Sequence, residues 1–198
     1  MANYSLILAS SSRYRRELLD RLGLDYVCVS PDVDESVLPE ETPLDVCQRL
    51  ARAKALAVAQ AHPGSVVIGS DQVCDLDGVA LGKPHTFEKA VEQLERMQSR
   101  RLVFHTAVCV VRADGTLEET VSDTIITMRP LSRETIEDYV RREEPYDCAG
   151  SAKIEKLGIA LMQSVASDDP TSLIGLPLMR LTSMLANAGI PALAGLKG

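Results

Sequence analysis

The sequence lacks a long basic block and any excess of basic residues. Its 198 residues include 21 Lys and Arg against 28 Asp and Glu, which gives a formal net charge of −7 at pH 7. A negatively charged chain is repelled by nucleic acids and by anionic membrane surfaces. Neither a polymeric nucleic acid nor a membrane is therefore expected as a partner, although the balance leaves room for a local basic pocket.

The sequence also lacks a C-x-x-C pair. Its five cysteines are odd in number and far apart, which is atypical of a disulfide framework or a zinc site. We expect reduced, buried thiols and a cytoplasmic location. No apolar run reaches about 18 residues, and no basic N-terminal region precedes a cleavage-site pattern, so neither membrane spanning nor secretion is expected. The cysteines are Cys28, Cys47, Cys74, Cys109 and Cys148.

Several common catalytic and nucleotide-binding motifs are missing. There is no G-x-G-x-x-G, H-E-x-x-H or G-x-S-x-G, and the histidines are scattered. The segment 78–83 resembles a P-loop, but it is one residue too short and is followed by Pro84 in place of Ser or Thr. We therefore do not expect a clustered metal site, a serine catalytic triad or a P-loop in this chain.

The chain has no internal repeat, linker or low-complexity tract, so we expect one domain over residues 1–198. Apolar residues make up 45% of the sequence, which is enough for a continuous core. Strand and helix patterns follow one another in a mixed order, which predicts an α/β fold with a mixed sheet. Strands are expected at 5–9, 26–30, 65–68, 102–111, 117–128 and 157–162, and helices at 14–22, 43–61, 87–97, 133–141 and 176–187.

One stretch combines a buried strand with polar groups that need partners. Residues 65–68 predict a buried strand, and Asp71 and Gln72 follow almost directly. A purely structural strand would have to satisfy these groups at an energetic cost. At the end of a strand, Asp71 could be a solvated hairpin residue, a metal ligand or a general base, and the local pattern does not choose among them.

A hydroxyl-rich loop at 10–12 joins the first strand to the first helix. Ser10 and Ser12 could cap the helix, or they could present hydroxyl and backbone N–H groups to an anion at the positive end of the helix dipole. Arginines in the first turn favour the anion, because guanidinium groups suit phosphate and cations otherwise oppose the dipole there. These arginines are Arg13, Arg15 and Arg16.

Three further charged residues extend this set. Glu35, Lys54 and Lys83 are ordinary surface charges when each is viewed singly. The Asp-Gly turn at 77–78 predicts a hairpin that returns Lys83 toward the strand carrying Asp71. Together with Asp71 they form a minimal set for phosphoanhydride hydrolysis, in which carboxylates hold Mg²⁺ or orient water and lysines offset the phosphate charge.

Short segments with these residues occur in a fixed order: Leu8-Ala9-Ser10-Ser11-Ser12 with Arg15-Arg16-Glu17-Leu18-Leu19, Val33-Asp34-Glu35, Ala53-Lys54-Ala55, Gly69-Ser70-Asp71, Gly82-Lys83-Pro84 and Gly175-Leu176-Pro177. The set resembles the Maf family of nucleoside triphosphate pyrophosphatases over nearly the whole chain. The resemblance implies an elongated mixed sheet flanked by helices, related to the inosine triphosphatase fold, with the site in a cleft. It also implies a small-molecule nucleotide substrate, release of diphosphate that depends on a divalent cation (Mg²⁺ or Mn²⁺), a cytoplasmic location and a homodimer.

The resemblance implies a role for each matching residue. Asp71 would be the base that activates water, and Glu35 would assist it with the metal or the water. The phosphate-binding residues would be Ser10, Ser12, Arg15, Lys54 and Lys83.

Two positions are similar to the branch of the family that hydrolyses 7-methyl-GTP. These are Gln72 and Glu155, where the dTTP/UTP branch has Thr and Gln. The chain departs from the family pattern at Arg13, where Pro is usual, and at Tyr14, where this branch commonly has Trp. An aromatic face can stack on the positive charge of N7-methylguanine, and a carboxylate such as Glu155 can accept hydrogen bonds from its N1–H and amine. Because Tyr stacks less strongly than Trp, a less strict base preference is expected.

We therefore expect a hydrolase that converts 7-methyl-GTP to 7-methyl-GMP and diphosphate, and so clears modified nucleotides. Two alternatives stay open. One is a dTTP, UTP or CTP pyrophosphatase of the same family. The other is a non-catalytic nucleotide-binding regulator of cell division, since the family was first named for inhibition of septum formation.

Overall fold

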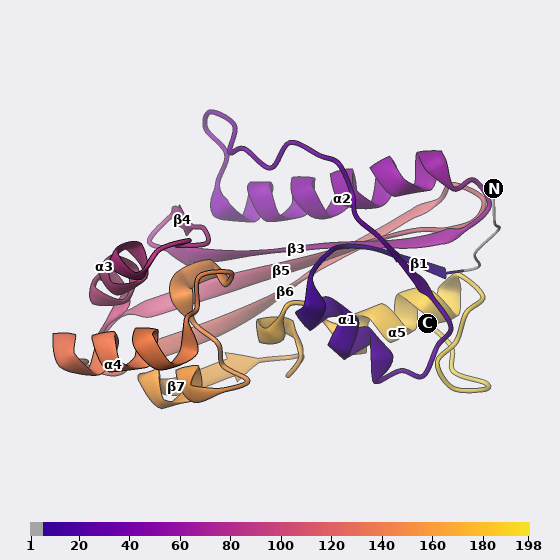
Figure 1. Cartoon of the computed structure of the whole chain (residues 1–198). Helices are drawn as coiled ribbons and strands as arrows, with labels where there is room; N and C mark the ends of the chain where they lie inside the picture. The colour runs from indigo at the N-terminus through magenta and orange to yellow at the C-terminus, as the bar shows by residue number, and fades with distance from the viewer. Residues whose placement is uncertain (1–5) are drawn as a thin grey trace.

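A seven-stranded mixed sheet forms the centre of the computed structural model, which describes residues 6–198. Its strands run in the order β2-β1-β3-β5-β6-β7, and the short β4 pairs with β3. β1 is parallel to β2 and β3, whereas the other pairings are antiparallel. Figure 1 shows the three long strands β3, β5 and β6 side by side across the molecule. The strands are β1 (Leu6–Ala9), β2 (Val27–Val29), β3 (Val66–Leu76), β4 (Val79–Leu81), β5 (Arg101–Val111), β6 (Leu117–Met128) and β7 (Met162–Ser167).

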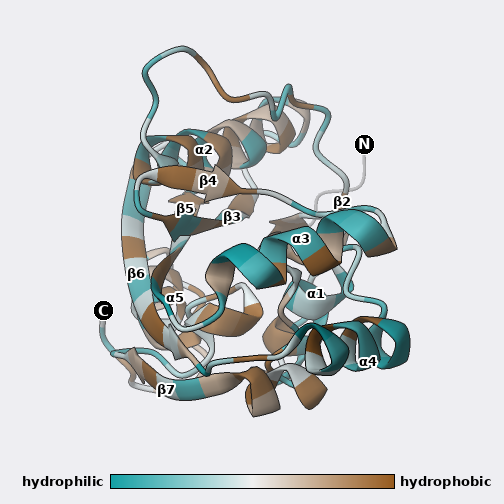
Figure 2. Ribbon diagram, turned by 90° about the vertical axis from the view of Figure 1, so that its left-hand side faces the viewer, coloured by the Kyte–Doolittle hydropathy of each residue, from teal (hydrophilic) through white to brown (hydrophobic). Residues whose placement is uncertain are grey.

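Helices cover both faces of the sheet (Figure 1). α2 lies along one face, while α1 and α5 pack on the opposite face at one end. α3 and α4 pack together at the other end, and Figure 2 shows mainly hydrophilic residues on the outer side of this pair. The helices are α1 (Arg13–Asp20), α2 (Pro43–Ala61), α3 (Phe87–Met97), α4 (Arg133–Glu143) and α5 (Leu178–Asn187), with 3₁₀ turns η1 (Ala149–Ser151), η2 (Leu157–Leu161) and η3 (Ser172–Ile174).

The local sequence signals explain most of these boundaries. Thr42, directly before Pro43, caps α2 and forms a capping box with Asp45. α2 therefore begins where the pattern predicts. The hydroxyl groups of Thr86 and Ser132 cap α3 and α4 by accepting hydrogen bonds from the backbone N–H groups of Lys89 and Thr135. The predicted mixed α/β fold, in which helices flank the sheet, is confirmed. No helix of residues 6–198 is both long and apolar enough to cross a membrane.

Several predicted boundaries are wrong. α1 ends at Asp20 rather than at 22, and α4 ends at Glu143 rather than at 141. The strand expected at 157–162 is the 3₁₀ turn η2, and the strand β7 follows it, because the chain turns tightly where the Gly158 N–H bonds to the Lys153 carbonyl. The final helix begins at Leu178 rather than 176. The strand predicted at 65–68 is longer than expected: β3 begins at Val66 and continues through Asp71 to Leu76, since β5 pairs with it over most of this length. Ser5, the first residue of the expected first strand, lies outside the described residues.

The sheet face opposite α2 carries two apolar clusters with polar residues between them. At one end, Val66 and Ile68 of β3 pack with α1 and α5. At the other end, Cys74 and Leu76 pack with α3 and α4. Between them the same face of β3 carries Ser70 and Gln72, because alternate residues of a strand share a face. The apolar clusters therefore frame a polar zone in the middle of the sheet.

Candidate active site

The middle of β3 has a partner strand on one side only. β1 pairs with residues 66–69 and β4 pairs with residues 74–76, both on the side away from β5. Among the described strands, none pairs with residues 70–73 on that side. We call residues 70–73 the open segment of β3. It contains Asp71 and Gln72, and it lies where β1 ends and the chain enters the hydroxyl-rich loop.

Asp71 forms a buried ion pair with Lys54. The Lys54 ammonium on α2 donates a 2.7 Å hydrogen bond to Oδ1 of Asp71 and lies 3.0 Å from Oε1 of Glu35. Lys54 is 5% exposed and Asp71 is 7% exposed, whereas Glu35 is exposed. Within residues 6–198, Oδ2 of Asp71 makes no hydrogen bond. The structure thus brings together three of the predicted residues and leaves one carboxylate oxygen available.

Gly69 allows α2 to approach β3 closely enough for this ion pair. A Cβ atom at position 69 would lie 2.3 Å from the Ala51 carbonyl oxygen and 2.5 Å from the Ala55 nitrogen. Such distances are excluded by steric repulsion, so only glycine permits this packing. Lys54 lies on the same stretch of α2 and reaches the carboxylate two residues beyond Gly69.

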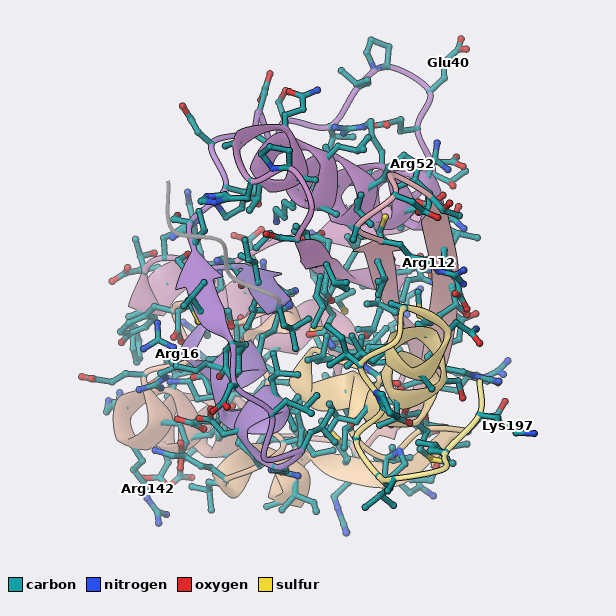
Figure 3. All side chains as sticks on the ribbon, turned by 90° about the vertical axis from the view of Figure 1, so that its right-hand side faces the viewer. Arg16, Glu40, Arg52, Arg112, Arg142 and Lys197 are labelled. Carbon is teal, nitrogen blue, oxygen red and sulfur yellow. The ribbon has the colours of Figure 1, made fainter. Side chains whose placement is uncertain are left out.

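A long loop between β2 and α2 carries Glu35. Arg49 of α2 holds this loop through an ion pair with Glu41 and a 2.9 Å hydrogen bond to the Ser36 carbonyl. Figure 3 places Glu40 at the outer end of the loop. The side next to Ser36 is thereby fixed to α2, which positions Glu35 at Lys54.

The hydroxyl-rich loop shows helix capping. Oγ of Ser12 accepts a 3.4 Å hydrogen bond from the Arg15 N–H, and Oγ of Ser10 accepts one of 3.1 Å from the Ser12 N–H. Nε of Arg15 donates to the Gly175 carbonyl at 2.9 Å, and Arg15 makes no ion pair with any residue from 6 to 198. Arg16, labelled in Figure 3, is exposed. The capping interpretation therefore applies to Ser12, and Arg15 keeps an unpaired charge.

Asp71 and Gln72 point to opposite faces of the sheet, because they are adjacent in a strand. The Gln72 amide nitrogen lies 2.9 Å and 3.0 Å from the carbonyl oxygens of Ser172 and Leu173, and 3.1 Å from Oγ1 of Thr106. These contacts occupy its N–H donors, so only its carbonyl oxygen is available to another partner.

Tyr14 contacts the loop that follows α4. Its hydroxyl lies 3.4 Å from Oδ2 of Asp147 and 3.7 Å from the Cys148 sulfur. The Arg13 guanidinium donates to this hydroxyl and lies 4.7 Å from the ring centroid. Burial raises the pKa of Tyr14, and burial also raises the pKa of the Cys148 thiol to about 12. Both groups therefore stay protonated at neutral pH.

Two predicted residues lie apart from these contacts. Lys83 is exposed, two residues beyond the end of the β3–β4 ladder at Leu81. The predicted hairpin is confirmed, but no hydrogen bond or ion pair within the described residues joins Lys83 to Asp71. Glu155 is exposed between η1 and η2 and makes no hydrogen bond or ion pair with residues 6–198.

The donor set at Asp71 fits a hard divalent cation that brings other ligands with it. No group of three or more His, Cys, Asp or Glu within residues 6–198 could hold a metal ion. Asp71 and Glu35 nevertheless supply two carboxylates beside Lys54, and one oxygen of Asp71 has no partner. Mg²⁺ commonly binds through one or two carboxylates, with water and substrate phosphates completing its shell.

The residues that connect Arg15 to the sheet have no predicted role in the site, although Ser70 and Gly175 lie within the ordered short segments. Ser70 donates a 3.2 Å hydrogen bond to the Gly175 carbonyl, the same oxygen that Arg15 binds. Thr106 is fully buried and donates to the Ser172 carbonyl at 2.9 Å. A threonine inside the apolar run of 102–111 was the available signal, because a buried hydroxyl needs a partner.

The fold and the site together define the structural class of this protein. A buried lysine, two carboxylates and an arginine without an ion pair lie beside the open segment of β3 in a mixed sheet. The chain is an α/β protein with a charged site of the kind that binds phosphate groups. The model of the family described as Maf-like protein matches residues 5–188. The chain belongs to this family.

Relatives in several bacteria are similar along almost their whole length. A protein of Bordetella pertussis named 7-methyl-GTP pyrophosphatase is 57% identical and covers 96% of this chain and 95% of its own. A protein of the same name from Pseudomonas syringae pv. tomato is 53% identical, with 94% and 97% covered. Among solved structures, the Staphylococcus aureus Ham1 protein has a TM-score of 0.47 at 18% identity, covering 62% of this chain and 71% of that chain. At this TM-score the structural likeness carries no argument about function.

Proposed function

We propose that this protein hydrolyses the α–β phosphoanhydride of 7-methyl-GTP and releases 7-methyl-GMP and diphosphate. The observation that carries the proposal is the buried Lys54–Asp71 ion pair at the open segment of β3, with Glu35 on the same ammonium. The relatives named 7-methyl-GTP pyrophosphatase support this choice of substrate.

In the proposed reaction, Asp71 accepts a proton from water through its free oxygen Oδ2. The water oxygen attacks the α-phosphorus, the bond from that phosphorus to the bridging oxygen breaks, and diphosphate leaves with the electron pair. Lys54 would offset charge on the phosphates, and its hydrogen bond to Asp71 would orient that carboxylate. Arg15 and Lys83 would bind the phosphates, with hydrogen bonds from Ser10 and Ser12.

A divalent cation, Mg²⁺ or Mn²⁺, is part of the proposal. Asp71 and Glu35 would hold it, and the phosphates would supply further ligands. When bound, such an ion neutralises charge on the phosphates as it develops. The net charge of −7 opposes the approach of a polyanion, so the local cations are needed for binding.

Base selection would involve Tyr14, Glu155 and Gln72. Tyr14 would stack on the methylated guanine on the ring face that Arg13 does not cover, or would exchange Arg13 for the base. Glu155 is exposed and free to accept hydrogen bonds from the guanine edge. Gln72 could contribute only its carbonyl oxygen, because its N–H groups contact η3.

The decisive experiment measures diphosphate released from a panel of triphosphates with Mg²⁺ or Mn²⁺. We expect the fastest release from 7-methyl-GTP and a loss of about 10²–10⁴-fold in turnover for Asp71→Asn, since a carboxamide cannot act as the base. Nucleotide binding by the variant should change little. Faster release from dTTP, UTP or CTP would overturn the substrate, and near-normal turnover by the variant would remove Asp71 from the role of base.

A cytoplasmic homodimer is the proposed form of the protein, as the family resemblance implies. Light scattering coupled to size-exclusion chromatography should give twice the mass of the 21.5 kDa chain. A mass equal to one chain at micromolar concentration would contradict the dimer.

A further inference from the structure

Three polar residues form a straight row across the sheet on the face opposite α2. Gln72 of β3 is paired in register with Thr106 of β5, which is paired in register with Ser122 of β6. Thr106 is fully buried and Ser122 is 5% exposed. We call these three residues the polar row. Because buried polar groups are costly without partners, the row requires a polar structure against it.

The turn η3 is that structure. The Ser172 carbonyl accepts hydrogen bonds from both Gln72 and Thr106, at 2.9 Å each. The Ser172 hydroxyl donates to the Ser122 hydroxyl at 2.7 Å. All three members of the polar row therefore bond to the same residue of η3, Ser172. These hydrogen bonds fix the position of the turn on the sheet.

The residue after η3 holds Arg15. Gly175 has φ of 126°, a conformation that favours glycine, and its carbonyl oxygen accepts from Nε of Arg15 and from Oγ of Ser70. With Nε bound, the guanidinium plane is oriented while its terminal nitrogens make no hydrogen bond within residues 6–198. Two N–H groups on a fixed guanidinium edge suit the oxygens of a phosphate.

We infer that Thr106 is a positioning residue for the triphosphate, which acts through η3 and Gly175 on Arg15. The Thr106 hydroxyl accepts from Gln72 at 3.1 Å and donates to Ser172, so it is the central member of the row. Its removal leaves the Ser172 carbonyl with one donor fewer and loosens the turn that orients Arg15. The inference rests on the proposed phosphate role of Arg15.

The test is a double-mutant cycle with inorganic triphosphate as the probe and calorimetry as the measurement. Thr106→Val should weaken triphosphate binding about fivefold in the native background, as expected for one hydrogen bond. It should have almost no effect in an Arg15→Ala background, because the group it positions is gone. Thr106→Ser, which keeps the hydroxyl, should restore binding. A merely structural role would give equal losses in both backgrounds.

Thr124→Val is the matched control. Thr124 is also fully buried on the same sheet face, but its hydroxyl bonds to Ser167 of β7 at 3.0 Å and not to η3. We expect it to lower the melting temperature and to leave triphosphate affinity unchanged. If Thr106→Val does not fold, Ser122→Ala removes another contact of η3 and should show the same dependence on Arg15.

The outcomes distinguish the positioning role of Thr106 from the phosphate-binding role of Arg15. Equal losses in the native and Arg15→Ala backgrounds, or no loss in either, would overturn the positioning role while triphosphate binding stands. Native affinity in Arg15→Ala itself would overturn the phosphate role of Arg15, and the positioning inference with it.

Discussion

Lys54 is the residue on which the charge balance of the site depends. It is almost completely buried, yet it contacts two carboxylates from different parts of the chain. A buried lysine is tolerated when it is paired, and removal of one partner leaves the other charge without compensation. Both the stability of the site and its chemistry should therefore depend on this one ammonium.

Lys54→Met should reduce turnover on the order of 100-fold and lower the free energy of unfolding by about 3 kcal/mol. The physical reason is that Asp71 then lies buried next to Glu35 with no cation between them. The comparison is Lys83→Met, since Lys83 is exposed and pairs with no described residue. That variant should raise KM with an unchanged melting temperature. Steady-state kinetics and urea denaturation measure both effects, and equal stability losses in the two variants would contradict the assignment of Lys54.

At the scale of elements, the contact between α2 and β3 at Gly69 sets the geometry of the site. The helix backbone occupies the space that a side chain at this position would need. Gly69→Ala should therefore displace α2, separate Lys54 from Asp71, destabilise the fold by about 3 kcal/mol and abolish most activity.

Gly82→Ala provides the control for Gly69→Ala. A Cβ atom at Gly82 would meet no atom within 4 Å. The free energy of unfolding of the Gly82→Ala variant should stay within about 1 kcal/mol of the native value, because the substitution mainly restricts the unfolded chain. If thermal or urea unfolding showed similar losses for both alanines, close packing of α2 could not be the reason for glycine at position 69.

Two side chains of the preceding segment cap α5: Oγ1 of Thr171 accepts from the Leu178 N–H at 2.9 Å, and Asp169 accepts from the Met179 N–H. The helix follows Pro177, whose side chain cannot cap it, and Oδ2 of Asp169 accepts from the Met179 N–H at 2.7 Å. Oδ1 of the same residue accepts from the backbone and hydroxyl of Thr171. Asp169 thus joins the turn before η3 to the start of α5.

Asp169→Ala should destabilise the protein by about 2 kcal/mol, since three donors lose a buried acceptor. Asp169→Asn should cost less, because it keeps an acceptor oxygen. Asp168 is exposed and forms no hydrogen bond within residues 6–198, so Asp168→Ala should be close to neutral. Chemical denaturation of the three variants tests this order.

At the scale of the whole molecule, buried thiols should make stability fall in alkaline solution. Burial raises the pKa of Cys47 and of Cys74 to about 12. Below pH 9 both thiols are protonated in the folded and unfolded chains. Above it the unfolded chain releases these protons while the folded chain keeps them, so rising pH favours unfolding by about 1.4 kcal/mol per pH unit for each thiol.

Urea denaturation between pH 9 and 11 measures this slope. Cys74→Ala is the control, because it removes one titrating thiol while every other alkaline titration is retained. Its slope should be shallower than the native slope by about 1.4 kcal/mol per pH unit. Identical slopes would show that the Cys74 thiol does not contribute to alkaline unfolding.

Much of the fold follows from local sequence patterns. The β-branched runs predict the β5–β6 hairpin, and Thr42 with Pro43 determines where α2 begins. The ordered short segments identify the family, and they include Lys54 and Asp71. These predictions succeed because turn chemistry, capping and strand propensity act over a few residues.

The meeting of residues that are distant in the sequence depends on the tertiary structure. β3 continues past Asp71 because β5 pairs with it, and Gln72 turns its amide toward η3. The Lys54–Asp71 pair requires the close approach of α2 at Gly69, and Ser122 of the polar row finds its partner, Ser172 of η3, 50 residues further along the chain. The amino-acid sequence alone specifies which chemical groups are present and the order of the elements. Their pairing depended on packing between segments far apart in the chain, which no local pattern encodes.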